Sequence, residues 1–283
     1  MKPSRPSLKP EENPPSRIRL IILDVDGTLL DSESQLREGV RQTIHSAIKE
    51  KVQISLASGR NKTQIDTLAL ELGIPGPLIS LGGACIGLPG SNPPLRHVVI
   101  SPDRANNLVI KSRELSLGIM IQTFTENLLE SDEETADEID RISSGHFTRT
   151  DDILVTLAEP ASKITLIGPG ATIASMQSLL DDELDPLYSA LSGERYLDIT
   201  ASGADKGTSA RYLIQYLGFY PSAVAAIGDG HNDISLFKQV GTSVAMGNAL
   251  EDVKQASDRV APSNDEEGAA WAIMKLLEHN IPL

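Results

Sequence analysis

The feature that most constrains the fold is an apolar segment that ends in two aspartates. The segment runs from Ile18 to Val25, and residues 20–23 are four consecutive apolar side chains. Such a near-continuous run is typical of a parallel strand that is buried on both faces of a sheet. In open α/β sheets ligands bind at the carboxyl ends of these strands, so Asp24 and Asp26 stand where a site is expected.

Similar apolar runs and amphipathic helices recur along the chain. Helical spacing at i, i+3, i+4 and i+7 starts at Ile65 and again at Ala210, and Gly73 and Gly218 end these two helices. Strands that alternate with helices predict an α/β fold, a Rossmann-like doubly wound parallel sheet. Further strands of this sheet are expected at Val52–Ala57, Leu78–Leu81, Val224–Ile227 and Ser243–Met246.

The segment from about Cys85 to Tyr196 follows another pattern, in which strand-like pieces are separated by only two or three helices. One helix is expected to begin at Ser131, where Ser131 and Glu134 form a capping box, and another spans about Thr172 to Asp182. This pattern predicts an α+β cap at 85–195, inserted between two segments of the core, 18–84 and 196–283. The strand-like pieces are His97–Ile100, Gly118–Phe124, Ile153–Leu157, Lys163–Ile167 and Tyr196–Ile199.

Residues 1–17 are rich in proline, lysine and glutamate and lack the apolar centre of a signal peptide. We expect a disordered tail there and, by default, a cytoplasmic location. No run approaches the roughly 18 apolar residues of a membrane-spanning helix, so no membrane partner is expected. The single cysteine, Cys85, excludes an intrachain disulfide and is expected to be a small buried apolar side chain.

The charge of the chain narrows the classes of ligand. The net charge is −14, from 25 basic and 39 acidic residues, which argues against the basic face that nucleic-acid binding needs. Aromatic residues make up only 4% of the chain, so a base-stacking surface is not expected either. If the substrate is an anion, the site must supply local positive charge of its own.

The sequence DVDGTLL at residues 24–30 carries the strongest chemical signal. Gly27 favours a turn after Asp26, which could bring both carboxylates to one site. Such a pair can bind a hard cation through oxygen, and one carboxylate can attack phosphorus to form a covalent intermediate. The alternative is that the Asp-Gly dipeptide only ends the strand and starts a turn.

The sequence GDGHND at residues 228–233 is the second signal, and it also follows an expected strand. If a helix starts near Gly230, Asp233 lies in its first turn. The motif then presents two carboxylates, Asp229 and Asp233, and the Asn232 amide toward the same strand ends. The alternative is an ordinary helix N-terminus, where the helix dipole favours acidic residues.

Two smaller signals could supply phosphate contacts. Ser58 and Gly59, in the sequence SGR, follow the expected strand Val52–Ala57 and could hold phosphate through a hydroxyl and backbone N–H groups. Lys206 stands near the start of a helix, where a cation opposes the helix dipole. A functional role is therefore favoured for this lysine, which would bring the positive charge that the chain otherwise lacks.

The order of these motifs, DxDGT, SGR, lysine and GDGxND, resembles that of the haloacid dehalogenase-like hydrolase superfamily. The chain resembles in particular its Cof-type, sugar-phosphatase-like branch, which carries a large α/β cap between the second and third motifs. The sequences VAMGNA at 244–249 and NDEEG at 264–268 are also similar to that branch. The resemblance extends from about Ile18 to the C-terminus.

The resemblance implies a role for each motif residue. Asp24 would be the nucleophile that forms an aspartyl phosphate, and Asp26 would act as general acid and then as base. Mg²⁺ would be held by the Asp24 carboxylate, the Asp26 backbone carbonyl and Asp229, and Asp233 would bind the ion directly or orient its waters. The residues that hold the phosphoryl group would be Ser58, Gly59, Lys206 and Asn232.

These roles predict a magnesium-dependent phosphatase that hydrolyses a small phosphate monoester, either a sugar phosphate or a phosphorylated cofactor. One alternative is a phosphomutase or phosphotransferase that uses the same intermediate. The other is a non-catalytic metabolite-binding protein. A non-catalytic binding protein is disfavoured, because every catalytic position holds a residue that can perform its catalytic role.

Four residues near these motifs have open roles. Gly82 stands where the branch usually has asparagine, so contacts at the site entrance are expected to differ. Arg60 could approach the substrate or pair with a core carboxylate. Asp31 is expected to cap the next helix, whereas Asp198 either pairs with a buried partner or contacts the substrate.

Overall fold

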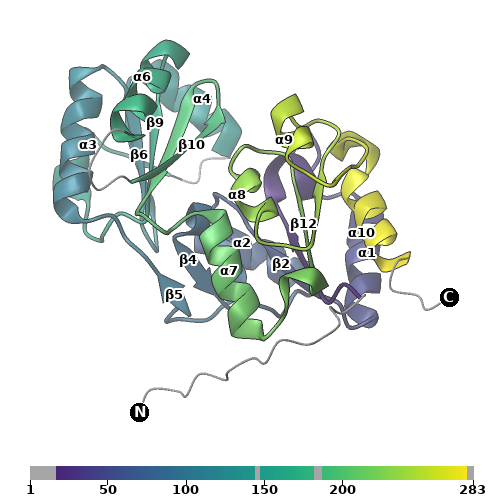
Figure 1. The fold of residues 1–283 in the computed structure, drawn as a ribbon. Helices are drawn as coiled ribbons and strands as arrows, with labels where there is room; N and C mark the ends of the chain where they lie inside the picture. Colours follow the sequence, from purple (N-terminus) through teal and green to yellow (C-terminus); the bar gives the residue numbers. More distant parts are fainter. Residues whose placement is uncertain (1–16, 144–146, 182–186, 279–283) are drawn as a thin grey trace.

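The computed structural model describes residues 17–143, 147–181 and 187–278, which form two α/β parts (Figure 1). The predicted N-terminal tail, except Arg17, lies outside these residues. One part contains a five-stranded parallel sheet built from both ends of the chain, and the other contains a six-stranded sheet from its middle. The predicted α/β fold is confirmed. Within the described ranges, every helix is too short or too polar to cross a bilayer.

The five-stranded sheet places the first strand of the chain in its interior. Its order is β14-β13-β12-β1-β2, and all neighbours are parallel. Every residue of β1 is buried, as expected of a strand that is covered on both faces. The strands are β1 (Leu20–Leu23), β2 (Gln53–Leu56), β12 (Val224–Gly228), β13 (Thr242–Ala245) and β14 (Arg259–Val260).

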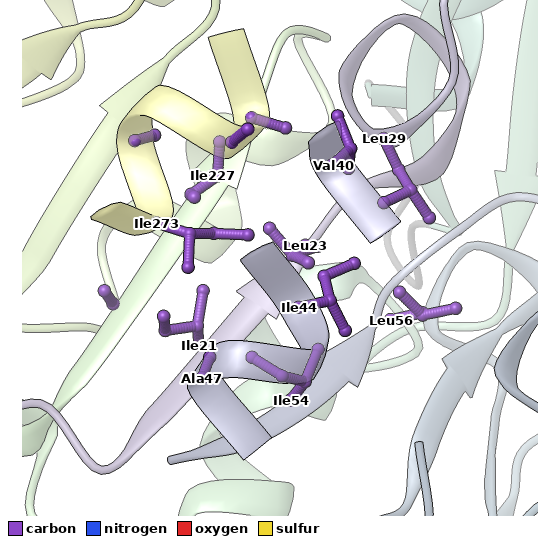
Figure 2. Packing of buried hydrophobic residues seen from close by; sticks show 14 of the residues in the cluster. Ile21, Leu23, Leu29, Val40, Ile44, Ala47, Ile54, Leu56, Ile227 and Ile273 are labelled. Atoms are coloured by element: carbon purple, nitrogen blue, oxygen red, sulfur yellow. The ribbon is translucent and has the colours of Figure 1, made fainter. Parts of the chain in front are cut away.

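Helices cover both faces of this sheet, as a doubly wound fold requires. They are α1 (Glu38–Lys49), α2 (Lys62–Glu71), α7 (Lys206–Leu217), α8 (Asp233–Phe237), α9 (Glu251–Gln255) and α10 (Gly268–Glu278). Ile21 and Leu23 of β1 share a core cluster with α1, α2 and α10 (Figure 2). Leu20 and Ile22 point the opposite way and share one with α7, α8 and α9.

The predicted strand Leu78–Leu81 lies beside β2 but pairs mainly elsewhere. β3 (Leu78–Ser80) meets the end of β2 through one parallel bridge, between Ala57 and Ile79. Along its length it pairs with β4 (Cys85–Gly87), which is followed by β5 (Arg96–His97) in a small antiparallel sheet. Cys85 is buried there, as predicted.

The six-stranded sheet has the order β10-β11-β9-β6-β7-β8, with antiparallel pairs except for β7 and β8. Its strands are β6 (Gly118–Gln122), β7 (Asn127–Glu130), β8 (Thr148–Arg149), β9 (Lys163–Ile167), β10 (Tyr188–Gly193) and β11 (Tyr196–Thr200). The helices of this part are α3 (Pro102–Glu114), α4 (Glu133–Ser143), α5 (Ile153–Thr156) and α6 (Gly170–Asp181). The last residue of the predicted helix Thr172–Asp182 lies outside the described residues.

Of the predicted strand His97–Ile100, only His97 lies in a strand, β5. Two further expectations for residues 85–195 are wrong. The predicted strand Ile153–Leu157 is instead the helical turn α5, which ends at Thr156, because the Asp152 carboxylate accepts a hydrogen bond from the Leu154 N–H at 3.0 Å and caps the turn. Helix α4 is capped by Asp132, which accepts from the Thr135 N–H at 2.7 Å, and not by Ser131. In both places one hydrogen bond from backbone to side chain decides the local structure, which the apolar pattern does not reveal.

Candidate active site

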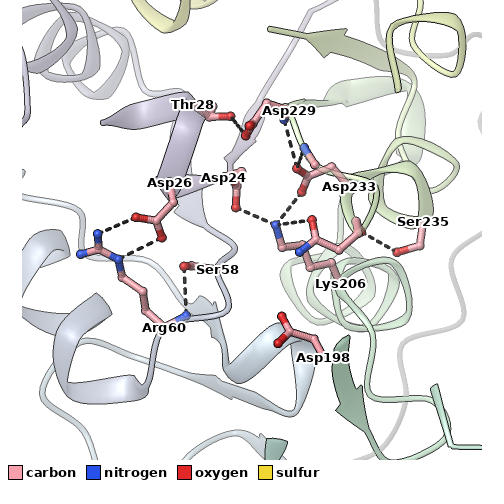
Figure 3. A network of polar contacts seen from close by, with 12 residues as sticks. Asp24, Asp26, Thr28, Ser58, Arg60, Asp198, Lys206, Asp229, Asp233 and Ser235 are labelled. Carbon is pink, nitrogen blue, oxygen red and sulfur yellow. Dashed lines mark hydrogen bonds and ion pairs between the residues drawn. The ribbon is translucent and has the colours of Figure 1, made fainter. Parts of the chain in front are cut away.

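Predicted site residues from three motifs meet at the carboxyl edge of the core sheet (Figure 3). Asp24 follows β1, Ser58 follows β2, and Asp229 follows β12. Because these strands are parallel neighbours, their carboxyl ends lie at one edge. Backbone pairing continues past the strand ends, since the Asp24 N–H donates to the Ile227 carbonyl at 2.9 Å. The sheet order therefore collects residues that are distant in the sequence.

Lys206 reaches this edge from the first turn of α7, directly after the capping residue Asp205. Its Nζ lies 2.6 Å from Asp24 Oδ1 and 2.6 Å from Asp233 Oδ1, and only 1% of its side chain is exposed. A third acceptor, Asn232 Oδ1, is 3.2 Å away. Lys206 thus supplies the local positive charge that an acidic chain needs at an anion site.

Burial and ion pairing shift the protonation equilibria of this cluster. Burial raises the pKa of Asp24 well above its ordinary value, and the Asp233 and Asp229 carboxylates raise it further, although Lys206 opposes them. Burial also raises the pKa of Asp229 to about 6, again with a contribution from Asp233. Burial alone would lower the pKa of Lys206, but the carboxylates of Asp233 and Asp24 outweigh it and raise that pKa. One ammonium group balances only part of the buried negative charge, so the rest requires protons or a second cation.

The residues of the cluster fit a hard divalent cation. Asp24, Asp229 and Asp233 each offer one carboxylate oxygen, and these oxygens lie within 4.8 Å of one another. Oxygen ligands of this kind are the ones that Mg²⁺ prefers. Gly27 lets the backbone pass close to the cluster, because a Cβ there would lie 2.3 Å from Asp229 Oδ2. The Thr28 hydroxyl orients Asp229 by donating to its Oδ1 at 2.9 Å.

Asp233 is the most constrained carboxylate of the three. Its side chain is fully buried, and its Oδ1 accepts the hydrogen bond from Lys206. Its Oδ2 accepts from the N–H groups of Asp229 at 3.1 Å and of Gly230 at 3.0 Å. Asp233 therefore holds the lysine and shapes the loop that carries Asp229.

Asp26 lies beside this cluster, and its carboxylate points toward Arg60 (Figure 3). The turn at Val25–Leu29, in which Gly27 has a φ of 79°, gives Asp26 this direction. Arg60 Nη2 lies 2.6 Å from Asp26 Oδ1, and Arg60 Nε lies 3.0 Å from Oδ2, so the pair is bidentate. The Asp26 side chain is 56% exposed and stays within reach of a bound molecule. Of the two roles left open for Arg60, the structure has the pairing with a core carboxylate.

Ser58 offers a hydroxyl donor beside the cluster. Its Oγ accepts from the Arg60 N–H at 3.1 Å, and the residue is 1% exposed. Its hydroxyl has no acceptor among the described residues, so it can donate to an anion. The next residue, Gly59, lies against the six-stranded sheet, because a Cβ on it would be 3.1 Å from Lys163 Nζ of β9.

Asp198 and Gly82, whose roles the sequence left open, both lie near Lys163 of β9. Asp198 pairs with Lys163 at 2.7 Å and accepts from the Thr165 hydroxyl at 2.7 Å. Of the two roles left open for Asp198, the structure therefore has the pairing with a buried partner. Lys163 Cδ lies 3.8 Å from the position of a Cβ on Gly82, and Thr200 Cγ2 lies 3.7 Å from it. At Gly82 the core loop therefore faces side chains of the six-stranded sheet.

The expectation that Asp31 caps the next helix is wrong. Its Oδ1 accepts from the N–H groups of Glu33 at 3.1 Å and Gln35 at 2.9 Å, and its Oδ2 accepts from Arg37 Nε at 3.0 Å. The chain makes a turn before α1 begins at Glu38, and Asp31 closes that turn.

The structure also brings Asn248 to the site, a residue for which the motifs predicted no role. Its Nδ2 donates to the Gly27 carbonyl at 2.9 Å and lies 3.5 Å from Asp229 Oδ2. Asn248 closely follows β13, so the rule that led to Asp24, Ser58 and Asp229 could have found it as well.

Comparisons with known proteins agree with this geometry. The family model of haloacid dehalogenase-like hydrolases matches residues 21–273. The chain is 27% identical to the putative phosphatase YxeH of Bacillus subtilis, over 92% of this chain and 98% of that protein. It is also 27% identical to the 5-amino-6-(5-phospho-D-ribitylamino)uracil phosphatase YwtE of the same organism, again over 92% and 98%. A solved haloacid dehalogenase-like hydrolase from Bacteroides thetaiotaomicron superimposes with a TM-score of 0.81 and 30% identity, over 92% of this chain and 100% of that one.

The matched range begins in β1 and ends in α10, so it includes every motif residue of the site. Both named relatives are called phosphatases, which agrees with the predicted phosphoric monoester hydrolase. The chain therefore belongs to the haloacid dehalogenase-like hydrolase family, in the Cof-type, sugar-phosphatase-like branch that the order of its motifs predicted.

Proposed function

We propose that the protein is a magnesium-dependent phosphatase that hydrolyses a small phosphate monoester through an aspartyl phosphate on Asp24. The observation that carries this proposal is the buried contact of Lys206 with Asp24 at the carboxyl edge of the sheet, next to two further carboxylates. A nucleophile that is flanked by a fixed cation and a metal-binding cluster suits phosphoryl transfer, where catalysis is mainly positioning and charge neutralisation.

In the first step, a carboxylate oxygen of Asp24 bonds to phosphorus while the bond from phosphorus to the leaving oxygen breaks. The Asp26 carboxyl group donates its proton to that leaving oxygen. Lys206 and the Ser58 hydroxyl bind the transferring phosphoryl oxygens, and Gly59 and Asn232 lie beside them. Asp24, Asp229, Asp233 and the Asp26 backbone carbonyl would hold Mg²⁺, which would supply further neutralisation of charge.

In the second step, the Asp26 carboxylate takes a proton from water as the water oxygen bonds to phosphorus. The bond between phosphorus and Asp24 breaks, which releases inorganic phosphate and restores the Asp24 carboxylate. The bidentate contact with Arg60 positions Asp26 as a carboxylate, the form that takes the proton from water in this step. In the first step, where one Asp26 oxygen carries a proton, Arg60 can hold the residue through the other oxygen.

We further propose that the inserted six-stranded part is a cap that selects the substrate and excludes water from the site. The six-stranded part lies close to Gly59 and Gly82 of the core, which supports this role. Gly59 directly follows the phosphate-binding residue Ser58, and Gly82 lies in the core loop that faces the six-stranded sheet. The predicted insert, residues 85–195, ends before β11, but β11 pairs with β9 and β10. We therefore place the end of the cap after Thr200.

We expect the substrate to be a sugar phosphate or a phosphorylated cofactor precursor. The relative YwtE is named for a ribityl phosphate, which is a sugar-alcohol phosphate attached to a uracil. A small phosphate ester also suits an acidic chain whose site carries one buried lysine and a place for one metal ion.

The test is phosphate release from a panel of phosphorylated metabolites, with Mg²⁺ and with EDTA, by the wild type and by Asp24→Asn. We expect release that needs Mg²⁺ and that is lost in the variant. Mass spectrometry of acid-quenched wild-type enzyme should detect one added phosphoryl group on the peptide that contains Asp24. Release that persists in Asp24→Asn would contradict the covalent route, and release that appears only with a sugar acceptor would indicate a phosphotransferase instead.

A further inference from the structure

A cavity of about 710 Å³ lies between the core and the cap, beside the candidate active site. Its core wall includes Arg60 and Asn61 directly before α2, and its cap wall includes Thr125 and Glu126 of the turn between β6 and β7 and Asn127 at the start of β7. The two walls touch where Asn61 Nδ2 donates to Asn127 Oδ1 at 3.4 Å. The cavity is large enough for a molecule of sugar-phosphate size.

Arg60 connects this cavity with the reacting groups. The residue lines the cavity, and its guanidinium group holds the Asp26 carboxylate at 2.6 and 3.0 Å. Asp26 is the residue that we propose to protonate the leaving oxygen. Arg60 is thus the residue shared by the cavity and the proposed proton donor, and a leaving group on the Asp26 side of the site would extend toward this cavity.

The charges in the cavity wall are paired, with one exception. Arg60 is paired with Asp26, and Arg41 with Glu71. Glu126 is half-buried, and throughout the described ranges no hydrogen bond or ion pair engages its carboxylate. The other polar side chains of the wall are hydroxyls and amides, among them Ser34, Thr63, Gln64 and Thr148.

We propose that Glu126 is a specificity-determining residue, which selects leaving groups that are neutral and rich in hydroxyls; this rests on the proposed phosphatase function. A carboxylate can accept hydrogen bonds from two neighbouring hydroxyls, and the hydroxyls and amides of the wall can satisfy the remaining ones. The same carboxylate repels a leaving group that carries its own carboxylate or second phosphate. Because Arg60 is occupied by Asp26, the wall offers no free cation to offset that repulsion.

The experiment compares substrates that differ at one group. Glycerol 3-phosphate and 3-phosphoglycerate have the same size, but a terminal CH₂OH of the first is a carboxylate in the second. Glucose 6-phosphate and ribitol 5-phosphate add hydroxyls, and p-nitrophenyl phosphate has none. The kcat/KM of each is measured for the wild type, for Glu126→Gln, and for the control Glu134→Gln, which changes an exposed cap glutamate at the start of α4, outside the cavity wall.

We expect the wild type to prefer glycerol 3-phosphate to 3-phosphoglycerate by about tenfold or more, as unfavourable charge contacts of this kind imply. Glu126→Gln should lower kcat/KM for the sugar and polyol phosphates by about fivefold, mainly through KM, because a charged acceptor becomes a neutral one. It should raise kcat/KM for 3-phosphoglycerate and leave p-nitrophenyl phosphate unchanged. Glu134→Gln should match the wild type on every substrate.

An equal change of Glu126→Gln on all substrates, or no change in the ratio of glycerol 3-phosphate to 3-phosphoglycerate, would overturn the role of Glu126 alone. A wild-type preference for glucosamine 6-phosphate over glucose 6-phosphate that vanishes in Glu126→Gln would also overturn it, because the carboxylate would then bind an ammonium group. Failure of the folded, magnesium-loaded wild type to release phosphate from any compound, p-nitrophenyl phosphate included, would overturn the proposed function as well.

Discussion

The carboxyl edge of the core sheet and the cavity between core and cap are both polar, but they differ in how their charged groups are buried and paired. At the core edge, Lys206 and the carboxylates of Asp24 and Asp233 are buried in direct contact. In the cavity, the lining is mostly hydroxyls and amides, and Glu126 is the one charged group there without a partner among the described residues. The first region concentrates charge that must be balanced, and the second offers neutral hydrogen-bonding groups.

This difference follows from what each region has to bind. A phosphoryl group is the same anion in every phosphate ester, so fixed charges can serve it in every substrate. Leaving groups differ in their hydroxyls and charges, and buried hydrogen-bonding groups discriminate among such molecules, because a ligand that lacks a partner group leaves them unpaired. The core edge would then decide how fast phosphate is transferred, and the cavity between core and cap would decide which ester is accepted.

The strongest test of this division between core edge and cavity is a substitution of the proposed nucleophile, Asp24. Asp24→Asn should lower kcat by about 10⁴-fold or more on every phosphate ester alike, as losses of a covalent nucleophile do. The neutral amide keeps the shape of the side chain, so circular dichroism should report an unchanged fold. A loss of kcat that depended on the leaving group would contradict this division, because the core edge would then also affect which substrate is accepted.

Removal of the buried cation should act on stability as well as on activity. Lys206→Met leaves Asp24 and Asp233 buried without their ammonium partner, so the free energy of unfolding should fall by about 3–5 kcal/mol. Urea unfolding in the absence of Mg²⁺ measures this loss. A matched control is Lys62→Met, since Lys62 is similarly buried but faces the single carboxylate of Asp66. We expect the smaller loss in Lys62→Met. Equal losses in the two variants would contradict the prediction, because the loss would then not depend on the two carboxylates that Lys206 contacts.

The contact between Arg60 and Asp26 links the two regions and should affect proton transfer. Arg60→Gln should lower kcat for alkyl phosphates by about 10- to 100-fold, because general acid catalysis depends on a positioned carboxyl group. With p-nitrophenyl phosphate, whose leaving group is weakly basic, the loss should be much smaller. Steady-state kinetics on the two ester types measure the difference, and equal losses on both would mean that Arg60 acts on the phosphoryl group itself.

The smallest effect should come from an ion pair on the outside of the cap. Arg113 donates two hydrogen bonds to Glu130 and lowers the pKa of that carboxyl group, with help from the Ile153 N–H. A lowered pKa stabilises the folded state above the ordinary pKa of glutamate, and the contribution is lost as the pH falls through the lowered value. Glu130→Gln should therefore reduce the free energy of unfolding by about 1 kcal/mol at pH 7 and by almost nothing in strong acid.

Urea unfolding across this pH range provides the measurement, with Glu133→Gln as a control on an exposed glutamate of α4. Both variants should keep the wild-type kcat/KM, because neither residue lines the cavity or the core edge. A pH-independent difference between Glu130→Gln and the wild type would contradict the assigned cause.

The residues at the core edge could be predicted from the sequence for a physical reason. A strand buried on both faces is a short apolar run, and the polar residues just after it reach the carboxyl edge of the sheet. This rule led to Asp24, Ser58 and Asp229, and applied once more it leads to Asn248. The same reasoning failed for residues 153–157 and for the cap of α4, where single hydrogen bonds from Asp152 and Asp132 override the apolar pattern.

The sequence by itself thus determined the α/β class and which polar residues follow the strands of the core sheet, because local periodicity carries that information. Only the tertiary structure decided that Arg60 pairs with Asp26, that Lys163 approaches Gly59, and that Glu126 faces a cavity. The first contact joins the loops after two neighbouring strands of the core sheet, whereas the other two features lie between the core and the six-stranded sheet. Their geometry depends on how strands and sheets pack together, and no spacing along the chain encodes it.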